Sequence, residues 1–523
     1  MQDISLSTFD YAIVGMYFLL VFAIGIYVAR RTHTGDDLFL AGRRLGWLPI
    51  GLSLFASNIS STTLIGLAGA AYTWGIAVAN YEWMAAPILV VFALIMVPLY
   101  LNAKIGTVPE FLEYRYDRLV RRYFSLLTII ANIIVDTAGT LFAGAIVLTL
   151  FVPQLDVFSA ALLLAAVAGI YTAAGGLAAV VYTDVLQAVI LLIGSAVVAI
   201  LSFAQLDYSW SQLVSQVPPQ HLSLMLPLDD KNLPWLGTLV GVPVLGFYFW
   251  CTNQFIVQRV LGARSVTHAR YGVLLAGLLK LPVLFLMVLP GVMATVFLPG
   301  LEQGDSVFPA LVGTLLPAGL AGLVIAALVA ALMSSIDSTL NSAAALVTLD
   351  FVKPSFPQLT QRQTALVGRV AIVVFMLLSA VVAPAIGNFE GLFHYLQTAL
   401  SYLVPPVVVI FLLGLFSKRA GAGAALTTLI GGHAVSALCF LATMTGWLDL
   451  HFTLIAGLIF AVSSILFIVC SRMGMPASAQ QIKHFMFRPA LIAPEHPVQW
   501  WRDYRVQAGV LLALTTGLVV LFW

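Results

Sequence analysis

The stretch Ser53-Leu54-Phe55-Ala56-Ser57-Asn58-Ile59-Ser60-Ser61-Thr62-Thr63 crowds hydroxyls and one amide into the middle of an otherwise apolar segment. That segment, Trp47 to Tyr72, is long enough to cross a bilayer at about 1.5 Å per residue. Lipid offers no hydrogen bonds, so a polar centre is stable there only where it faces protein or a water-filled cavity. One interpretation is a helix broken at mid-membrane, whose freed carbonyls and hydroxyls bind a small cation. The other is an intact helix whose hydroxyls bond back to their own backbone.

The composition of the whole chain is that of a membrane protein. Of the 523 residues, 61% are hydrophobic and only 9% are charged, and the mean hydropathy is +1.02. Soluble globular proteins do not have this composition, so we expect an all-α polytopic membrane protein. Apolar runs of about 20 residues predict ~14 transmembrane helices. These begin near positions 10, 47, 77, 122, 157, 184, 236, 271, 317, 366, 390, 421, 449 and 507.

The basic residues predict how the spans are oriented. Over the expected loops, 22 of the 24 Lys and Arg residues fall on odd-numbered loops, and Lys231 alone falls on an even one. Because loops rich in Lys and Arg stay on the cytoplasmic side, the odd loops are expected inside. The sequence therefore predicts a multi-pass protein of the cytoplasmic (inner) membrane with both the N-terminus and the C-terminus outside.

A second interrupted span is expected five spans after the first. The seventh span contains Gly241, Pro243 and Gly246, followed by the polar run Cys251-Thr252-Asn253-Gln254. Two inverted repeats of five helices, each opening with a discontinuous helix, have this spacing. We therefore predict a single transmembrane domain over 1–523. It would consist of a peripheral helix at 10–29, a first repeat at 47–205, a second repeat at 236–416 and flanking helices at 421–523.

Ionisable residues inside the expected spans are costly in lipid and are therefore candidates for function. They are Glu82, Asp136, Asp184, Lys280 and Asp337. Lys280 needs a partner or a wet cavity: it either contacts the solute or forms a permanent ion pair with Glu82 or Asp136. Asp184 lies near the inner end of its span, where a solvated carboxylate and a cation ligand are both open interpretations. Asp136 leaves room for a cationic solute.

A ladder of hydroxyls follows near the end of the ninth span. It consists of Ser334, Ser335, Ser338 and Ser342. Ser334 and Ser338 are four residues apart, and Ser335 and Ser338 are three apart, so they share a helix face. Oxygen ligands suit hard cations such as Na⁺, although small hydroxyl residues also serve helix packing. Joined to a broken helix rich in carbonyls, the ladder predicts a sodium site.

Several stretches of the chain resemble the sodium/solute symporter family, and most of all its sodium/glucose (galactose) cotransporter branch. They run from about residue 39 to residue 420 and comprise Phe39-Leu40-Ala41-Gly42-Arg43, Ala56-Ser57-Asn58-Ile59-Ser60, Tyr81-Glu82-Trp83-Met84, Thr107-Val108-Pro109-Glu110-Phe111, Tyr182-Thr183-Asp184-Val185-Leu186-Gln187, Asn253-Gln254 with Gln258-Arg259, Leu289-Pro290-Gly291, and Ser334-Ser335 through Asn341-Ser342. The resemblance implies the leucine-transporter-like inverted-repeat fold with extra flanking helices.

The resemblance also implies where sodium binds. The ligands would be the backbone carbonyls of Ala56, Ile59 and Ala331 and the hydroxyls of Ser334 and Ser335. A second sodium position of the family would use Asp184 and Ser338. Asp337 stands beside them, where related chains often have a neutral residue, so that second site is altered here.

For the solute, the resemblance implies a set of side chains and an outer gate. The solute positions are Asn58, Glu82, Lys280 and Gln397, and the gate positions are Leu67, Tyr81 and Phe393. The chain departs from the sugar branch at Thr63, Ala85, Gly246 and Phe249, where that branch has glutamine, serine, asparagine and tyrosine. These changes argue against glucose or galactose itself and leave the sodium site untouched. We add Thr63, Tyr81, Phe249 and Asp136 to the expected solute site, and Phe249 to the gate.

These observations predict a sodium-coupled secondary active symporter that imports a small polar solute, a sugar or polyol, across a lipid bilayer by alternating access. The alternative solute is an organic acid of the sialic acid or monocarboxylate type. No arginine lies inside any expected span to clamp a carboxylate, which leaves Lys280 alone for that role.

Other classes of function are disfavoured by what the chain lacks. A transporter-like membrane sensor would need a signalling domain, and no loop or tail could hold one. An enzyme is not expected, because the three cysteines and eight histidines suggest neither a nucleophile–base pair nor a metal cluster. No feature of the charge distribution points to a nucleic acid partner.

Overall fold

The computed structural model describes residues 7–151, 154–301, 304–317, 319–388, 392–493 and 499–523. These residues form helices throughout, with two isolated bridges and no strand among them. The α-helices of the first half are α1 (Thr8–Ala29), α2 (Gly35–Leu40), α3 (Trp47–Asn58), α4 (Ser61–Trp74), α5 (Asn80–Trp83), α6 (Ala85–Val91), α7 (Val97–Asn102), α8 (Val108–Arg115), α9 (Arg118–Ile130), α10 (Ala138–Phe151), α11 (Val157–Ala204), α12 (Trp210–Gln216) and α13 (Trp235–Phe247).

The second half continues the same pattern. Its α-helices are α14 (Gln254–Leu261), α15 (Val266–Lys280), α16 (Leu289–Phe297), α17 (Val307–Leu315), α18 (Leu320–Leu346), α19 (Lys353–Ser355), α20 (Gln361–Val382), α21 (Leu392–Leu403), α22 (Pro405–Leu412), α23 (Ala422–Met444), α24 (Phe452–Met473), α25 (Ala479–Phe485) and α26 (Tyr504–Leu521). Five segments are π-helical: η3 (Phe92–Met96), η4 (Ala131–Thr137), η6 (Tyr248–Thr252), η7 (Leu284–Val288) and η9 (Val347–Val352). Short 3-10 turns are η1 (Ala41–Arg43), η2 (Gly75–Ala79), η5 (Pro219–Leu222), η8 (Gly304–Ser306), η10 (Ala383–Asn388), η11 (Pro489–Ile492) and η12 (Trp500–Arg502).

The predicted all-α polytopic architecture is confirmed. Within the described ranges, ten helices are long and apolar enough to cross a membrane, or eleven if the bent pair Val266–Lys280 and Leu284–Phe297 is counted as one span. α3, with 12 residues, is too short to count alone, whereas Thr63–Asn102 is counted once although it covers α4 and the whole of the next expected span. The expected number of ~14 spans, which counts each interrupted span once, stays a prediction.

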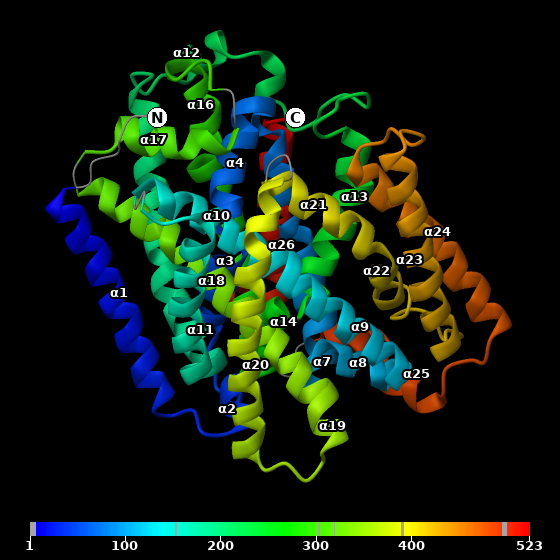
Figure 1. Ribbon diagram of the computed structural model, residues 1–523. Helices are drawn as coiled ribbons and strands as arrows, with labels where there is room; N and C mark the ends of the chain where they lie inside the picture. The colour runs from blue at the N-terminus through cyan, green and yellow to red at the C-terminus, as the bar shows by residue number, and fades with distance from the viewer. Residues whose placement is uncertain (1–6, 152–153, 302–303, 318, 389–391, 494–498) are drawn as a thin grey trace.

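Helix α18 is the centre of the molecule. Almost every residue from Ala321 to Leu346 is buried, and the helix packs most extensively against α11, with α1, α20 and η4 also in contact (Figure 1). Its many Ala and Ser residues allow these close approaches, because small side chains let helix backbones come near one another in a membrane protein. The serine ladder is therefore enclosed on every side by other helices.

Both predicted interruptions are present, but the second has a different cause from the one expected. α13 runs without a break through Gly241, Pro243 and Gly246, and the chain leaves the helix only at Asn253, with ψ 126°. The two glycines instead allow close packing: a Cβ at Gly241 would lie 2.1 Å from the Thr453 carbonyl oxygen. A Cβ at Gly246 would lie 2.4 Å from the side chain of Ile88. The break thus falls in the polar run alone.

The loops rich in basic residues share one side of the molecule. Figure 1 shows α2, α8, α19 and α25, which belong to odd-numbered expected loops, toward its lower side. α12 and α17, which belong to even-numbered expected loops, lie toward the upper side. This arrangement agrees with the expectation, from the count of basic residues, that odd- and even-numbered loops lie on opposite sides of the membrane.

One glycine turns the chain between the two halves of α11. Gly176 has φ +59°, a conformation that L side chains rarely adopt, and a Cβ there would lie 2.3 Å from the Leu38 carbonyl oxygen. The change of direction within α11 is therefore a glycine-dependent kink against α2.

We expect Gly176→Ala to lower the free energy of unfolding by more than about 1 kcal/mol, because it combines left-handed strain with a backbone clash. Thermal unfolding of the purified protein in detergent measures the change. Gly509→Ala is the matched control, since a Cβ there meets nothing within 4 Å. Equal melting temperatures for the two variants would contradict the assignment.

Candidate functional site

The first element of the site is the break between α3 and α4. α3 ends at Asn58, and Ile59 leaves the helix with φ −85° and ψ 83°. The amide of Ser60 bonds to the Asn58 carbonyl (3.1 Å), and the amide of Thr63 bonds to the Ser60 hydroxyl (3.2 Å). In an unbroken helix these two amides would bond to the carbonyls of Ala56 and Ile59. Both carbonyls have therefore lost their helical partners, as the broken-helix interpretation predicts.

The second element is the serine ladder of α18, which lies beside the end of α3. The hydroxyl oxygens of Ser57 and Ser334 are 3.1 Å apart, and Ser57 directly follows Ala56. Ser335 donates to the Ala331 carbonyl (3.1 Å), so two groups of the expected ligand set are bonded to each other. The structure thus brings the carbonyl end of α3 against the α18 residues that the family resemblance assigns to sodium.

A buried arginine occupies the neighbourhood of Asp184. The Arg259 guanidinium is 1% exposed, donates to Asp184 Oδ2 (3.2 Å) and also bonds to Ser57 and Ser338. The other carboxylate oxygen of Asp184 accepts a hydrogen bond from Ser334 (2.6 Å). Asp184 is therefore a fully engaged buried carboxylate and not a solvated one.

The expectation that no arginine lies inside a span stays a prediction, because the candidate span here ends at Thr252. Arg259 stands on α14, directly after the break at Asn253, and every residue of that helix is buried. Hydropathy places Arg259 in a loop because the apolar run ends before it, whereas Asp184 compensates its charge inside the protein. The pair Asp184 and Ser338, expected at a second sodium position, thus contacts a side-chain cation, and Ser338 also donates to Asp337 (3.1 Å).

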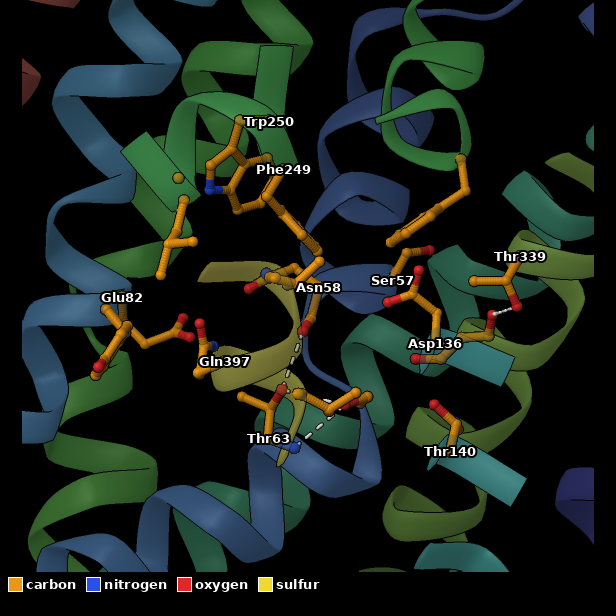
Figure 2. Close-up of a pocket in the computed structure, with 18 of the residues that line it drawn as sticks. Ser57, Asn58, Thr63, Glu82, Asp136, Thr140, Phe249, Trp250, Thr339 and Gln397 are labelled. Carbon is orange, nitrogen blue, oxygen red and sulfur yellow. Dashed lines mark hydrogen bonds between the residues drawn. The ribbon is translucent and has the colours of Figure 1, made fainter. Parts of the chain in front are cut away.

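A pocket of about 130 Å³ opens beside the break (Figure 2). The expected solute residues that line it are Asn58, Thr63, Tyr81, Glu82, Asp136, Phe249 and Gln397. The side-chain oxygen of Asn58 has no hydrogen-bond partner among the described residues, so it is an unused acceptor. Figure 2 shows Glu82 and Gln397 on one side of the pocket and Asp136 and Thr140 on the other.

Lys280 lies behind the pocket and is not among its lining residues. Its ammonium group is buried and bonds to Glu82 Oε2, which makes a buried ion pair. The same ammonium lies 5.4 Å from the ring centre of Trp250. Of the two roles considered for Lys280, the geometry shows the ion pair, with Glu82 as its partner. The second carboxylate oxygen of Glu82 makes no hydrogen bond to the described residues and is available to the pocket.

The expected gate is only partly assembled in the described residues. Tyr81 and Phe249 line the pocket, whereas Leu67 is fully buried in the apolar packing around α4. The side chain of Phe393 lies outside what the structure describes. Sequence reasoning missed Trp250, Thr140 and Thr339 in the lining. Thr140 could have been found, because it is four residues after Asp136 on the same helical segment.

Comparison with known proteins gives the family of this chain. The model of the sodium:solute symporter family matches residues 38–432. The chain belongs to the sodium:solute symporter family. It is 35% identical to sodium/glucose cotransporter 4 of Danio rerio over 82% of this chain and 71% of that protein. It is 36% identical to sodium/myo-inositol cotransporter 2 of Homo sapiens over 81% and 68% of the two chains.

The solved structures agree on the fold. A Na⁺-coupled sialic acid symporter in a substrate-bound outward-open state superposes with a TM-score of 0.79 at 24% identity, covering 91% of this chain and 100% of that one. Its family and its relatives make this chain a multi-pass membrane transporter with Na⁺ as its coupling ion, and not an enzyme.

We expect Lys280→Met to strand the buried Glu82 carboxylate and to lower the free energy of unfolding by about 3–5 kcal/mol. The double variant Lys280→Met with Glu82→Gln should recover most of that loss, because no uncompensated charge remains. Thermal unfolding in detergent measures both, with the exposed Lys231→Met as the control. A single variant as stable as the wild type would show that the ion pair does not form.

Arg259→Met should destabilise the protein in the same way, since it leaves Asp184 without a counter-charge, and by a similar amount of about 3–5 kcal/mol. Asp184→Asn in the same chain should restore part of the stability. The exposed Arg488→Met provides the matched control for loss of an arginine. If the double variant were less stable than Arg259→Met alone, the two side chains would not form one charge-compensated pair.

Proposed function

We propose that this symporter imports a polyhydroxylated solute, a sugar or polyol, together with Na⁺ by alternating access. The observation that carries the proposal is the break at the end of α3. The break releases the carbonyls of Ala56 and Ile59 from their helical hydrogen bonds. Asn58, whose side chain lines the pocket, lies between these two residues in the chain. Ion and solute would therefore bind to the same short stretch of chain.

The chemistry of the pocket supports a solute with several hydroxyls. Asn58 and Glu82 offer unused acceptor oxygens, and Gln397 offers an amide that both donates and accepts. Phe249 and Trp250 provide apolar ring faces against which a sugar or cyclitol ring can pack. The named substrates of the two relatives described above, glucose and myo-inositol, have this combination of a ring and hydroxyls.

An organic acid fits the pocket less well. No Lys, Arg or His is among its described lining residues, and the nearby Lys280 is already neutralised by Glu82. A carboxylate solute would be placed beside the Asp136 carboxyl group, and two carboxylates at short range in a low-dielectric site repel each other.

For the ion, we propose ligands from both sides of the contact between α3 and α18. These are the carbonyls of Ala56, Ile59 and Ala331 and the hydroxyls of Ser334 and Ser335. The hydrogen bond from Ser335 to Ala331 would break as both groups turn to the ion. The second position, with Asp184, Ser338 and Asp337, is bonded to Arg259 through Asp184 and Ser338, so we propose a single Na⁺ per cycle.

One sodium ion supplies enough free energy for accumulation of the solute. Entry of the ion down about 100 mV and a tenfold gradient releases roughly 3.7 kcal/mol, which sustains ~500-fold accumulation of a neutral solute.

We further propose that two five-helix inverted repeats, at 47–205 and 236–416, rock against each other, with a peripheral helix at 10–29 and flanking helices at 421–523. The gate would comprise Leu67, Tyr81, Phe249 and Phe393. The protein would sit in the cytoplasmic membrane with both termini outside, in keeping with the shared side of the basic loops.

We expect purified protein in proteoliposomes to take up at least one radiolabelled neutral sugar, amino sugar or polyol when an inward Na⁺ gradient is imposed, and not when K⁺ replaces Na⁺. A panel of hexoses, hexosamines, pentoses, inositols and linear polyols, with sialic acid and lactate as acidic comparators, measures this. Uptake of the acids alone, or uptake driven by a proton gradient alone, would contradict the proposal.

We expect Ser335→Ala to weaken the apparent sodium affinity about 10- to 150-fold, the equivalent of losing one hydrogen-bond-like ligand to a charged group. Uptake measured against sodium concentration gives the affinity. Ser436→Ala is the matched control, because Ser436 is likewise a buried serine that donates to the carbonyl four residues earlier, but in α23. If both variants keep the wild-type sodium dependence, Ser335 is not a ligand.

A further inference from the structure

The pocket contains two carboxylates, and only one of them has a counter-charge. Glu82 is paired with Lys280. Asp136 makes no hydrogen bond or ion pair with any described residue. Because the rest of the described lining carries no basic side chain, Asp136 is the pocket carboxyl group that has no counter-charge among the described residues.

Asp136 lies on the π-helical segment η4, a distortion that often marks functional positions in helices. The next residue, Thr137, donates to the Asn132 carbonyl (2.6 Å) and shares a hydrogen bond with Thr339 of α18 (2.6 Å). The π-segment is thus bonded to the core through Thr137, while Asp136 lines the pocket (Figure 2).

The oxygen atoms near Asp136 suit an ammonium group better than Na⁺. Hard cations in proteins take several oxygen ligands at once. Thr339 is engaged with the Ser335 carbonyl (2.9 Å) and with Thr137, which leaves Thr140 as the neighbouring hydroxyl. A carboxylate and one hydroxyl form an incomplete shell for a metal ion, but they match the three N–H donors of a protonated amine.

We infer that the solute carries a protonated amino group besides its hydroxyls and is an amino sugar or an amino polyol. The ammonium group would bind Asp136 on one side of the pocket. The hydroxyls would bind Asn58, Gln397 and the free oxygen of Glu82 on the other (Figure 2). This inference rests on the proposed function, because it assigns the chemistry of the same solute site.

The energetic reason is charge compensation. A neutral sugar would close the pocket over a carboxylate without a counter-charge, which is costly at membrane depth. A cationic group on the solute removes that cost and adds a charge-assisted hydrogen bond, which is stronger than a neutral one. The ammonium group of the solute would thus supply a counter-charge for Asp136, as Lys280 supplies one for Glu82.

The test uses matched triplets of probes on the full-length protein in proteoliposomes. Each triplet is a neutral hexose, the hexosamine with an amine in place of one hydroxyl, and its N-acetyl derivative: glucose, glucosamine and N-acetylglucosamine, and the galactose and mannose counterparts. We expect the wild type to take up one hexosamine with an affinity at least tenfold higher than both partners of its triplet. Asp136→Asn should abolish that preference, whereas Asp449→Asn, the same change on an exposed loop, should keep it.

The outcomes separate this inference from the proposed function. Sodium-dependent uptake of the neutral hexoses, with no preference for the amine in the wild type, overturns the inference and leaves the proposed function standing. An unchanged preference in Asp136→Asn, or a changed sodium affinity with the preference kept, also overturns it. If no sugar or polyol of the panel shows sodium-dependent uptake, both fail. Sodium- and probe-dependent thermal stabilisation in detergent gives the same comparison for a variant that binds without transporting.

Discussion

The structure depends on a backbone that stops being helical at Ile59 and Ser60 inside a bundle that is apolar outside. An interrupted helix in lipid would expose unpaired amides and carbonyls, each at a cost of several kcal/mol. Here the amides are satisfied locally, by the Asn58 carbonyl and the Ser60 hydroxyl, but the carbonyls of Ala56 and Ile59 keep no helical partner. Carbonyls without helical partners are the groups that the proposed Na⁺ site needs as ligands. The tight enclosure by α11, α15 and α18 keeps lipid away from it.

Two buried ion pairs surround this break and fix the elements that form the site. Arg259–Asp184 joins α14 to the second half of α11 and, through Ser57 and Ser338, to α3 and α18. Lys280–Glu82 joins α15 to α5. Such pairs add little net stability, because desolvation offsets attraction, but neither partner can be lost alone. They therefore act as constraints on position, and they leave Asp136 as the one pocket carboxylate without a described counter-charge.

The sequence predicts the all-helical fold, the two interrupted spans and seven of the residues that line the pocket, because these follow from local patterns: apolar length, hydroxyl clusters and family motifs. It could not predict which carboxylate pairs with Lys280, since Glu82 and Asp136 are equally suitable by type and the partner lies 198 residues away. Hydropathy assigns Arg259 to a loop because it does not register charge compensation by Asp184. Gly241 and Gly246 are typical of helix breakers by residue type, although they are contact points for Thr453 and Ile88.

The same geometry explains how an ion and a solute could depend on each other. In the proposed function Na⁺ orders the carbonyls of Ala56 and Ile59, and Asn58, which binds the solute, lies between them in the chain. Binding of either Na⁺ or the solute would restrict the backbone torsions of this stretch. The second ligand to bind would then lose less conformational entropy, because the first has already ordered the backbone. The coupling is reciprocal, and a factor of ten in affinity corresponds to about 1.4 kcal/mol. A continuous helix could not transmit such an effect, because its backbone torsions are already fixed by hydrogen bonds before either ligand arrives.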